Sequence, residues 1–417
     1  MKPSMSNNQK NETMIKGKDI IVVGIQAWDI EIGSNCKNIA LEFAKHNRVL
    51  YVNPPMDRAT MGKDKHKEKI QKRIRIKKGL EPDLYEIGTN LWNLYPKNSV
   101  ESINWLPIHS VFKILNRRNA RLFSEDIKSA TERLNFKDVI LFNDSSMFLG
   151  RHLKEFLQPK VYAYYMRDYL VKVPYWQKHG EQMEPEVIQQ ADVLLTNSDF
   201  FADFGLQYTA YSYMVGQGCD VSHFSDDEGT IQVPAEFKDV PSPIIGYVGS
   251  LTSLRLDISL LEFIAEKRKN WSIVLVGPED EDFKKSKLHQ LPNVYFFGSK
   301  DGSELPAYVK GFDVAINPQL TNNLTIGNYP RKIDEYLAMG KPVIATQTKA
   351  MEMFSDYVYL ASSNEEYITL TEKALEENSK TLAEQRANFA KSHTWENNVS
   401  AIYQGIIKAT KHRIQWD

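Results

Sequence analysis

The chain has 417 residues, more than one hydrophobic core usually serves, so we expect two or three domains. Apolar residues make up 42% of the chain, which predicts a globular protein that buries a sizeable core. The formal net charge of −1 gives no basis for a nucleic-acid partner, and Cys36 and Cys219 have no metal-ligand spacing.

The amino terminus is polar, and residues 1–17 are expected to be a disordered tail without the apolar core of a signal peptide. No uninterrupted apolar run approaches the ~20 residues that span a bilayer. Two widely separated cysteines fit a reducing compartment. We therefore expect a cytoplasmic protein that lies at most on the inner surface of a membrane.

The first half of the chain opens with a strand over 20–24, a helix over 37–46 and a strand over 49–52. This order predicts a Rossmann-like parallel sheet, in which ligands bind beyond the carboxyl ends of the strands. The loop that follows Gly24, with Gly33 and Ser34, is therefore a candidate wall on the acceptor side of a binding cleft. Its glycines do not form a GxGxxG pattern, so no dinucleotide site is expected.

Residues 63–78 hold nine Lys or Arg against two acids. Such a basic segment suggests contact with an anionic membrane surface or a lipid-phosphate acceptor. The apolar residues between 105 and 115, followed by Arg117 and Arg118, could lie on the same interface. A solvated charged loop beside an ordinary core helix explains the same pattern.

Strands are next expected over 138–142 and 160–165, and the second ends at Arg167 and Asp168. Asp168 stands where sites of this fold class lie, and His179 and Glu184 follow in a loop or early helix. Asp168, His179 and Glu184 could each bind a substrate hydroxyl, although lone carboxylates and histidines are often structural. Strands over 191–197 and 212–216 complete the first sheet.

A polar, proline-bearing stretch after residue 215 marks the domain boundary. A second β-loop-α-β unit then begins, with a helix expected over 257–268. We predict an α/β fold with two Rossmann-like domains that face each other across a cleft. Their limits are 18–220 and 221–395, with 396–417 packing back on the first. Strands of the second sheet are expected over 244–249, 272–277, 294–298, 314–316 and 343–345.

The segment from Asn328 to Ala345 reads as a helix followed at once by a buried strand, with Pro330 in the first helical position and Gly340 as the left-handed cap. A helix start with Arg331 and Lys332 is suited to an anion. Glu335 lies one turn on, so a diphosphate clamp and a carboxylate for ribose hydroxyls would share one face. An ordinary helix with a surface Lys–Glu pair fits the spacing equally well.

The loop from Gly249 to Arg255 follows a strand directly. A glycine there lets the backbone approach a phosphate, the hydroxyls of Ser250 and Thr252 can donate, and Arg255 adds a forked donor. A strand followed by a glycine turn is common in α/β proteins. Together with the helix start near Lys332, however, the loop places anion-binding groups after two strands of one sheet.

Residues 200–396 resemble the C-terminal domain of a GT-B glycosyltransferase of the family 4 ("group 1") type. The segments that carry the resemblance are 247–255, 274–277, 313–318 and 330–344, with 217–224 similar to the Gly-Val-Asp-x-x-x-Phe linker and 393–396 similar to the Ser-Trp-Glu segment of that family. The Pro-x-Lys-x-x-Glu-Tyr variant at 330–336 resembles that of capsule and teichuronic-type transferases. The resemblance implies nucleotide-sugar binding and says little about the sugar.

By position, Glu335 matches the second glutamate of the Glu-x7-Glu motif, which holds the ribose, and Arg255 matches a lysine that contacts the diphosphate. Ser250 stands where the family usually has arginine. The first glutamate of the motif would fall at Gly327 and is absent, so the donor-sugar contact departs from the family pattern. Lys332 or Asn328 can compensate. The residues expected to bind donor are Gly249, Ser250, Thr252, Arg255, Asn328, Tyr329, Arg331, Lys332 and Glu335.

The resemblance implies a glycosyltransferase that moves a hexose-type sugar from a nucleotide-diphosphate sugar to a hydroxyl of a saccharide or lipid-linked acceptor. Catalysis would come from Arg255 and Lys332, which neutralise the leaving diphosphate, with Asp168 on the acceptor side. Family relatives are mostly retaining and need no metal, and no cofactor is expected here. Domain closure would exclude water. Two alternatives are a nucleotide-sugar 2-epimerase of the same fold and a non-catalytic nucleotide-sugar-binding protein.

Overall fold

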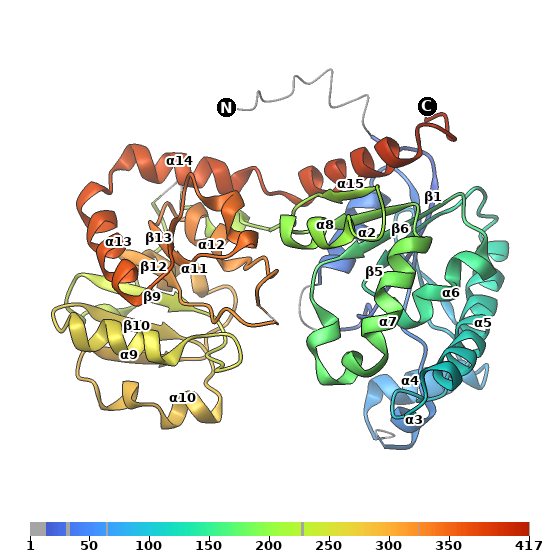
Figure 1. Ribbon diagram of the computed structural model, residues 1–417, viewed down its shortest axis with the longest axis horizontal. Helices are drawn as coiled ribbons and strands as arrows, with labels where there is room; N and C mark the ends of the chain where they lie inside the picture. Colours follow the sequence, from blue (N-terminus) through green and yellow to red (C-terminus); the bar gives the residue numbers. More distant parts are fainter. Residues whose placement is uncertain (1–13, 31–33, 64–65, 227–228, 324, 417) are drawn as a thin grey trace. The chain divides into compact units, whose positions relative to one another are not determined.

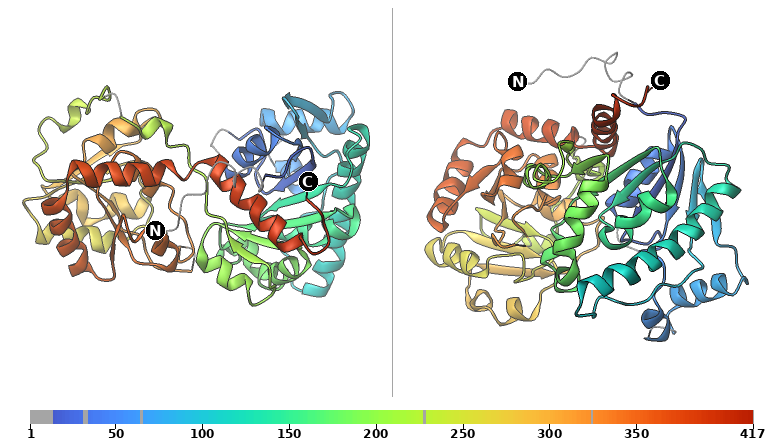
Figure 2. Two further views of the ribbon diagram at one scale, coloured as in Figure 1. Left: turned by 90° about the horizontal axis from the view of Figure 1, so that it is seen from above. Right: turned by 45° about the vertical axis from the view of Figure 1, so that its right-hand side comes forward.

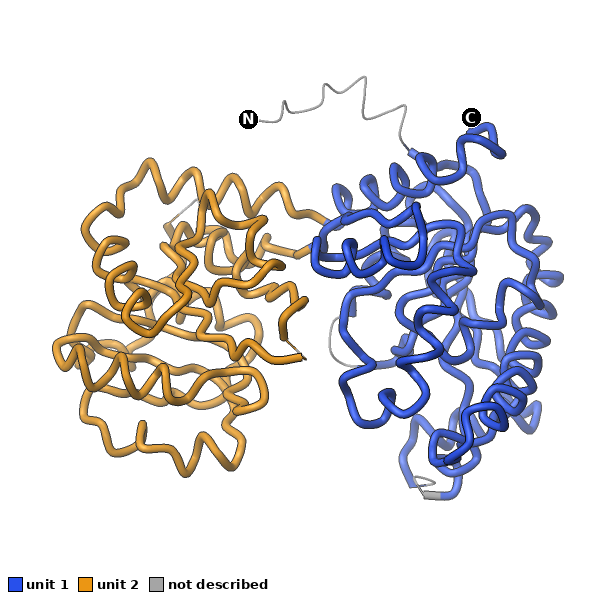
Figure 3. The backbone as a smooth tube through the Cα atoms, viewed as in Figure 1, with its two compact units in different colours: residues 1–218, 395–417 blue, residues 219–394 orange. Residues whose placement is uncertain are grey.

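The computed structural model describes residues 14–30, 34–63, 66–226, 229–323 and 325–416. The chain divides into two compact units (Figure 3). Unit 1 comprises Met1–Gly218 and Trp395–Asp417, and unit 2 comprises Cys219–Thr394. The predicted domain limits, after residues 220 and 395, differ from these by two residues and one. Each unit is an α/β layer structure, as predicted, so the predicted fold class is confirmed.

Unit 1 is built on an eight-stranded sheet in the order β3-β4-β2-β1-β5-β6-β7-β8. Its strands are β1 (Asp19–Gly24), β2 (Arg48–Val52), β3 (Leu84–Gly88), β4 (Leu91–Leu94), β5 (Ile140–Asp144), β6 (Val161–Met166), β7 (Val193–Thr196) and β8 (Ser212–Met214). Strand β3 pairs antiparallel with β4, and the other neighbours pair in parallel. All the predicted strands of this half are present, whereas the hairpin β3–β4 was not predicted.

Helices cover both faces of this sheet (Figure 1). They are α2 (Asn35–Ala44), α3 (Arg58–Lys63), α4 (Glu68–Lys77), α5 (His109–Arg133), α6 (Met147–Leu157), α7 (Pro174–Gln190), α8 (Asp199–Gly205) and α15 (Trp395–Thr410), with a short 3-10 helix, η1 (Leu170–Lys172). Phe43 of α2 and Tyr403 of α15 pack in the core on one face, and Phe123 of α5 and Val187 of α7 pack on the other. The left view of Figure 2 shows α15 running along unit 1.

Unit 2 is built on a six-stranded sheet, parallel throughout, in the order β11-β10-β9-β12-β13-β14. Its strands are β9 (Ile244–Val248), β10 (Ser272–Val276), β11 (Val294–Gly298), β12 (Val314–Asn317), β13 (Val343–Thr346) and β14 (Tyr359–Ala361). The first five were predicted. Because both faces are covered, the strands are nearly continuous apolar runs, as expected for a parallel sheet.

The helices of unit 2 are α9 (Ile258–Lys267), α10 (Glu281–Lys285), α11 (Leu305–Lys310), α12 (Lys332–Ala338), α13 (Asn364–Glu377) and α14 (Lys380–Lys391), with short 3-10 helices η2 (Ser222–Phe224), η3 (Ala235–Phe237), η4 (Lys287–Gln290) and η5 (Lys349–Phe354). Among the described parts of the chain, no helix has the length and apolarity that crossing a membrane requires.

The helix expected to begin at Pro330 begins later. Arg331 is the N-cap and the α-helix itself is Lys332–Ala338, so Pro330 precedes the helix and the predicted start is wrong by two residues. The predicted end is confirmed, because Gly340 has a φ of +69°. The Gly340 N–H donates to the Leu337 carbonyl (2.8 Å) and the Lys341 N–H to the Tyr336 carbonyl (3.1 Å), which is a Schellman cap.

Candidate functional site

In unit 2, strands β9 and β10 end side by side on two glycines that no other residue could replace. Gly249 has a φ of +142° and Gly277 a φ of +149°, values that L side chains rarely adopt. A Cβ on Gly277 would lie 1.9 Å from the Gly249 carbonyl oxygen. The Gly249 N–H donates to the Val276 carbonyl (2.9 Å). Because Gly249 and Gly277 have no side chains, the carboxyl edge of the sheet is formed there by backbone alone, here called bare backbone.

The ammonium group of Lys332 lies beside this bare edge. A Cβ on Gly249 would be 3.0 Å from Lys332 Nζ. Nζ donates to the hydroxyl of Tyr247 and lies 4.2 Å from the centroid of that ring. Among the residues that the structure describes, Lys332 has no direct ion pair: the Glu335 carboxylate interacts with its charge from a distance, and the group in contact with the ammonium is a neutral phenol. A half-buried cation of this kind favours an anionic ligand.

Glu335 and Arg331 lie one turn apart on the same helix. The Glu335 side chain is 16% exposed, and its Oε1 lies 3.6 Å from Arg331 Nη2. The alternative interpretation, a surface Lys–Glu pair, is not what the structure has, because the partner of Glu335 is Arg331. Burial raises the pKa of Glu335, and Arg331 and Lys332 oppose this rise. A carboxylate accepts hydrogen bonds only, so this group suits a ligand that offers hydroxyls.

The loop after Gly249 is held by the segment that leads into α10: the Leu251 N–H donates to the Pro278 carbonyl (2.8 Å), and the Asp280 N–H donates to the Leu251 carbonyl (2.9 Å). Asp280, the N-cap of α10, accepts from the Ser253 N–H (2.7 Å); burial acts to raise its pKa, but its hydrogen bonds, one of them from the hydroxyl of Thr252, lower it overall. Thr252 therefore has a partner within the unit. Arg255 is exposed and has no ion pair within the described ranges. Among the described residues, no hydrogen bond or ion pair joins Arg255, in the loop after β9, to Lys332, at the start of α12.

Asn328 and Tyr329 differ in how far their side chains are buried. The Asn328 N–H donates to the Thr325 carbonyl (2.9 Å), and its side chain is half-buried. Tyr329 is 4% exposed and packs in the core, where its hydroxyl donates to Asp334 (2.7 Å). Asp334 also lies 2.6 Å from His393 Nδ1. Tyr329 thus supports the loop from inside the unit and does not face a ligand.

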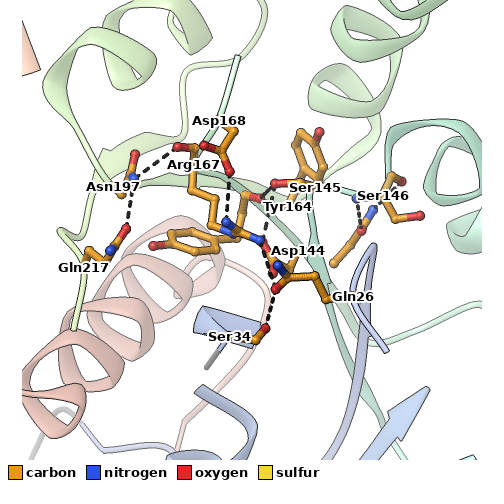
Figure 4. A network of polar contacts seen from close by, with 12 residues as sticks. Gln26, Ser34, Asp144, Ser145, Ser146, Tyr164, Arg167, Asp168, Asn197 and Gln217 are labelled. Atoms are coloured by element: carbon orange, nitrogen blue, oxygen red, sulfur yellow. Dashed lines mark hydrogen bonds and ion pairs between the residues drawn. The ribbon is translucent and has the colours of Figure 1, made fainter. Parts of the chain in front are cut away.

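In unit 1, the carboxyl edge of the sheet carries a cation between two carboxylates (Figure 4). Arg167, just after β6, donates from Nε to Asp144 (2.9 Å) and from Nη1 to Asp168 (2.9 Å). Asp144 is completely buried, whereas Asp168 is partly exposed. Burial alone would lower the pKa of Arg167, but Asp144 and Asp168 raise it above that of an ordinary arginine. The Asp168 carboxylate is therefore oriented by the Arg167 guanidinium, which the buried Asp144 holds in place.

A shell of amides surrounds this ion-pair network. The Gln26 side-chain oxygen accepts from Ser34 Oγ and from Arg167 Nη2 (3.4 Å). Asn197 donates to the Arg167 carbonyl (3.1 Å) and to Gln217 (3.2 Å). Ser34 is thus part of the network, whereas Gly33 lies outside the described residues.

His179 and Glu184 lie in the core of unit 1, so neither faces a substrate. His179 is 1% exposed and stacks on Phe112 with ring centroids 3.9 Å apart. Its Nε2 donates to the Leu106 carbonyl (3.1 Å), and burial lowers its pKa. Glu184 accepts from the hydroxyl of Tyr164 (3.0 Å), and burial raises its pKa to about 7. Both side chains are structural here, which corrects the expected acceptor role of His179.

Sequence reasoning missed Asp144. Asp144 pairs in register with Tyr165, so the end of β5 lies beside the end of β6, where Arg167 follows. The sequence did offer a signal: Asp144 stands at the carboxyl end of one strand, and the next strand ends just before Arg167 and Asp168. A cavity of about 240 Å³ also opens at this edge, lined in part by Gly24, Pro54, Ser146, Tyr175 and Trp176. It was not predicted, because no single segment forms it.

Helix α4 fills most of the basic stretch 63–78, of which residues 64–65 lie outside the described part. Its cations have partners within unit 1. Lys72 lies over the rings of Tyr85 and Tyr95, Arg73 donates to the Pro54 carbonyl (3.0 Å), and Arg75 pairs with Glu81. In the described ranges, no three His, Cys, Asp or Glu side chains gather as they would around a metal ion.

Comparison with protein families finds one match, in unit 2. Residues 242–377 match the family described as glycosyl transferases group 1. In sequence, 240 residues are 28% identical to the "Putative teichuronic acid biosynthesis glycosyltransferase TuaH" of Bacillus subtilis (strain 168). That match covers 54% of this chain and 58% of the relative, so it spans little more than half the length of that protein.

Solved structures resemble the whole chain in fold. A sucrose-phosphate synthase from Thermosynechococcus elongatus is 16% identical, with a TM-score of 0.62 over 95% of this chain and 99% of that one. Anabaena HepE in complex with UDP is 12% identical, with a TM-score of 0.62 over 95% and 100%. A trehalose 6-phosphate synthase from Burkholderia multivorans is 9% identical, with a TM-score of 0.66 over 96% and 99%. At these identities the likeness shows the fold, and that fold is GT-B, as predicted.

Proposed function

Because this chain has the GT-B architecture and a group 1 glycosyltransferase domain over residues 242–377, we propose that it is a glycosyltransferase. It moves a hexose-type sugar from a nucleotide-diphosphate sugar to an acceptor hydroxyl. One observation carries the proposal. The ammonium of Lys332, which has no direct ion pair with a carboxylate among the described residues, lies beside the backbone of Gly249, where a diphosphate can approach both.

The donor site extends along the same edge of unit 2. Lys332 and Arg255 bind the diphosphate, and Glu335 accepts hydrogen bonds from the two ribose hydroxyls, which are donors at adjacent carbons. Asn328 lies three residues before Arg331 and can reach the sugar, where Gly327 supplies no side chain. We propose a uridine nucleotide first, since HepE, a structure of the same fold, was solved with UDP and with UDP-glucose.

Catalysis consists mainly of stabilising the departing diphosphate. Negative charge develops on its oxygen as the bond to the sugar breaks, and a fixed ammonium is worth more there than in water. Two further features follow from the family resemblance: transfer retains the anomeric configuration, and it needs no metal. The anomeric coupling constant of the product tests the first, and an unchanged rate in a chelator tests the second.

The acceptor is a saccharide or a lipid-linked saccharide of cell-surface polysaccharide synthesis, at the cytoplasmic face of the membrane. The teichuronic acid name of the Bacillus subtilis relative supports this choice. Asp168 accepts a hydrogen bond from the acceptor hydroxyl, because Arg167 holds its carboxylate in place while leaving it partly exposed. The cavity at the same sheet edge offers space for the acceptor body.

The proposal is tested by incubating the full chain with each of several nucleotide sugars, with and without a panel of saccharide and lipid-linked acceptors. Release of nucleotide diphosphate together with a glycosylated acceptor is the expected result, and Lys332→Ala should slow both about 10²–10³-fold. Conversion of the donor sugar in the donor-only reaction would identify a 2-epimerase instead. Nucleotide binding without turnover in any mixture would identify a binding protein, and either result would reject the transferase.

A further inference from the structure

Unit 1 exposes a group of large apolar side chains at the amino-terminal end of α5. Trp105, Ile108, Val111, Ile114 and Tyr175, here called the α5 patch, have exposed fractions between 40% and 71%. Ile108, Val111 and Ile114 follow one another at intervals of three residues, so they form one stripe along the helix. A stripe of this kind on the solvent side of a helix marks an interaction surface.

Hydrogen bonds join the two segments that form the α5 patch. The Lys178 ammonium donates to the Trp105 carbonyl (2.8 Å), and the Asn104 amide donates to the Tyr175 carbonyl (3.3 Å). His179 also bonds the carbonyl of Leu106 (3.1 Å) and contacts the ring of His109. The start of α7 is therefore fixed against the residues that precede α5, and the patch is a single preformed surface.

The two segments that form the α5 patch carry cations and no acids of their own, and acids from neighbouring segments pair with some of these cations. Residues 102–124 include four Lys or Arg and no acid, and residues 169–180 include two Lys and no acid. Lys113, Arg117 and Arg121 have partners on other residues, namely Glu186, Glu155 and Glu125. Arg118 is exposed and has no ion pair in the described part of the chain. Two cations near the patch, Arg118 and Lys178, thus have no carboxylate partner among the described residues, and aromatic and apolar side chains beside such cations are the chemistry of a surface that binds an anionic bilayer.

The alternative surface, α4, is less suited to this role. Its exposed face lacks large apolar side chains, and Lys72, Arg73 and Arg75 are already held by partners in unit 1. The α5 patch also adjoins the cavity at the sheet edge, because Tyr175 belongs to both and Ser102 and Asn104 line the cavity wall. A bilayer against the patch would therefore lie next to the space proposed for the acceptor.

We propose that the α5 patch docks this protein onto an anionic phospholipid bilayer. This inference rests on the proposed function in one respect, namely that a lipid-linked acceptor lies at such a surface. The apolar stripe enters the interface between headgroups and acyl chains, while Arg118 and Lys178 bind lipid phosphates. Docking thus presents the cavity to the acceptor.

The test is cosedimentation of the full chain with vesicles of phosphatidylcholine alone and with 30% phosphatidylglycerol added. We expect binding to the anionic vesicles that weakens at high salt, and at least about tenfold weaker binding for Ile108→Glu. Leu206→Glu is the matched control, because Leu206 is equally exposed (57% for both residues) but lies outside the patch. Its binding should equal that of the wild type.

Three results would overturn the docking proposal. They are equal binding to neutral and anionic vesicles, equal binding by Ile108→Glu and wild type, and a change of oligomeric mass in Ile108→Glu, which would make the patch a face between copies. Circular dichroism and thermal unfolding of the same samples show whether each variant is folded, and nucleotide binding to unit 2, measured without vesicles, tests the transferase proposal separately. Because that measurement is independent of lipid, failure of docking and failure of the transferase proposal are distinguishable.

Discussion

The carboxyl edges of the two sheets occupy the same topological place and differ in electrostatics. At the edge of unit 1, Arg167 lies between Asp144 and Asp168, so its positive charge is already neutralised. At the edge of unit 2, Lys332 lies against the neutral ring and hydroxyl of Tyr247. The fold determines where ligands bind, whereas the pairing of charges determines which ligands bind. A neutral hydroxyl suits the first edge and a diphosphate suits the second.

The largest expected effect is a loss of folding stability when the cation that neutralises Asp144 in unit 1 is removed. Arg167→Ala leaves the carboxylate of Asp144 buried without a cation, and breaking a buried pair in this way costs about 3–5 kcal/mol of stability. Urea denaturation followed by circular dichroism measures this loss. Asp168→Ala removes only the partly exposed partner and should cost no more than about 1 kcal/mol. Equal losses in the two variants would contradict the distinction between a buried and an exposed partner.

The second prediction concerns the charge of unit 2. Lys332→Ala should lower kcat/KM for transfer about 10²–10³-fold, because the leaving diphosphate loses a preorganised cation. The matched control is Lys300→Ala, since Lys300 also lies over a tyrosine ring, that of Tyr308 (5.0 Å), but is paired with Glu236 (2.7 Å). The control should keep wild-type activity. A comparable loss in both variants would show that an uncancelled charge is not what matters.

Unit 1 also contains a buried carboxyl group, that of Glu184, which has no cation partner among the described residues and can be compared with Asp144, which has one. Burial raises the pKa of Glu184 from 4.5 to about 7, so the folded state holds a proton that the unfolded state has lost. Stability should therefore be fully present below pH 4.5 and fall as the pH rises to about 7. Glu184→Gln keeps an acceptor for Tyr164 and should be more stable than wild type at pH 8 by up to about 3 kcal/mol. Urea titrations at pH 5 and pH 8 measure the difference, which should shrink at the lower pH.

The smallest expected effect is the pH dependence of nucleotide binding. Burial raises the pKa of Glu335, and the protonated group accepts hydrogen bonds less well than the carboxylate. Affinity should therefore begin to fall, on acidification, at a higher pH than an ordinary glutamate pKa of about 4.3 would give. Isothermal titration calorimetry between pH 4.5 and pH 8 measures this. Glu335→Gln should bind more weakly at pH 8 and lose the pH dependence, and an unchanged profile would remove Glu335 from the site.

Much of the fold follows from local sequence signals. Continuous apolar runs predicted the central strands of both sheets, because strands covered on both faces have no alternating pattern. Gly340 predicted a helix end correctly, since a left-handed cap needs glycine. The hairpin β3–β4 was missed because its strands are short, β3 is half-buried or exposed throughout, and charged and polar residues stand among the apolar ones.

The site was harder to predict because long-range contacts decide it. His179, Met183 and Val187 recur at intervals of four residues on α7, a spacing that places His179 on the buried face, yet the isolated histidine suggested chemistry. The role of Asp144 could be recognised only from the strand register, which places it beside Arg167. Lys332 was identified from its motif, but its lack of a neutralising carboxylate depends on Tyr247, which is 85 residues away in sequence.

The central claim is that the uncancelled charge of Lys332 at the glycine edge of unit 2 binds a nucleotide diphosphate. The most direct measurement is a thermal-shift titration with UDP, GDP, ADP and dTDP on wild type, Lys332→Ala, Glu335→Ala and Lys300→Ala. We predict that one nucleotide raises the midpoint of wild type and of Lys300→Ala with increasing concentration, and that the other two variants lose this response. A wild type that responds to none of the four, or a Lys332→Ala variant that responds like the wild type, would contradict the claim.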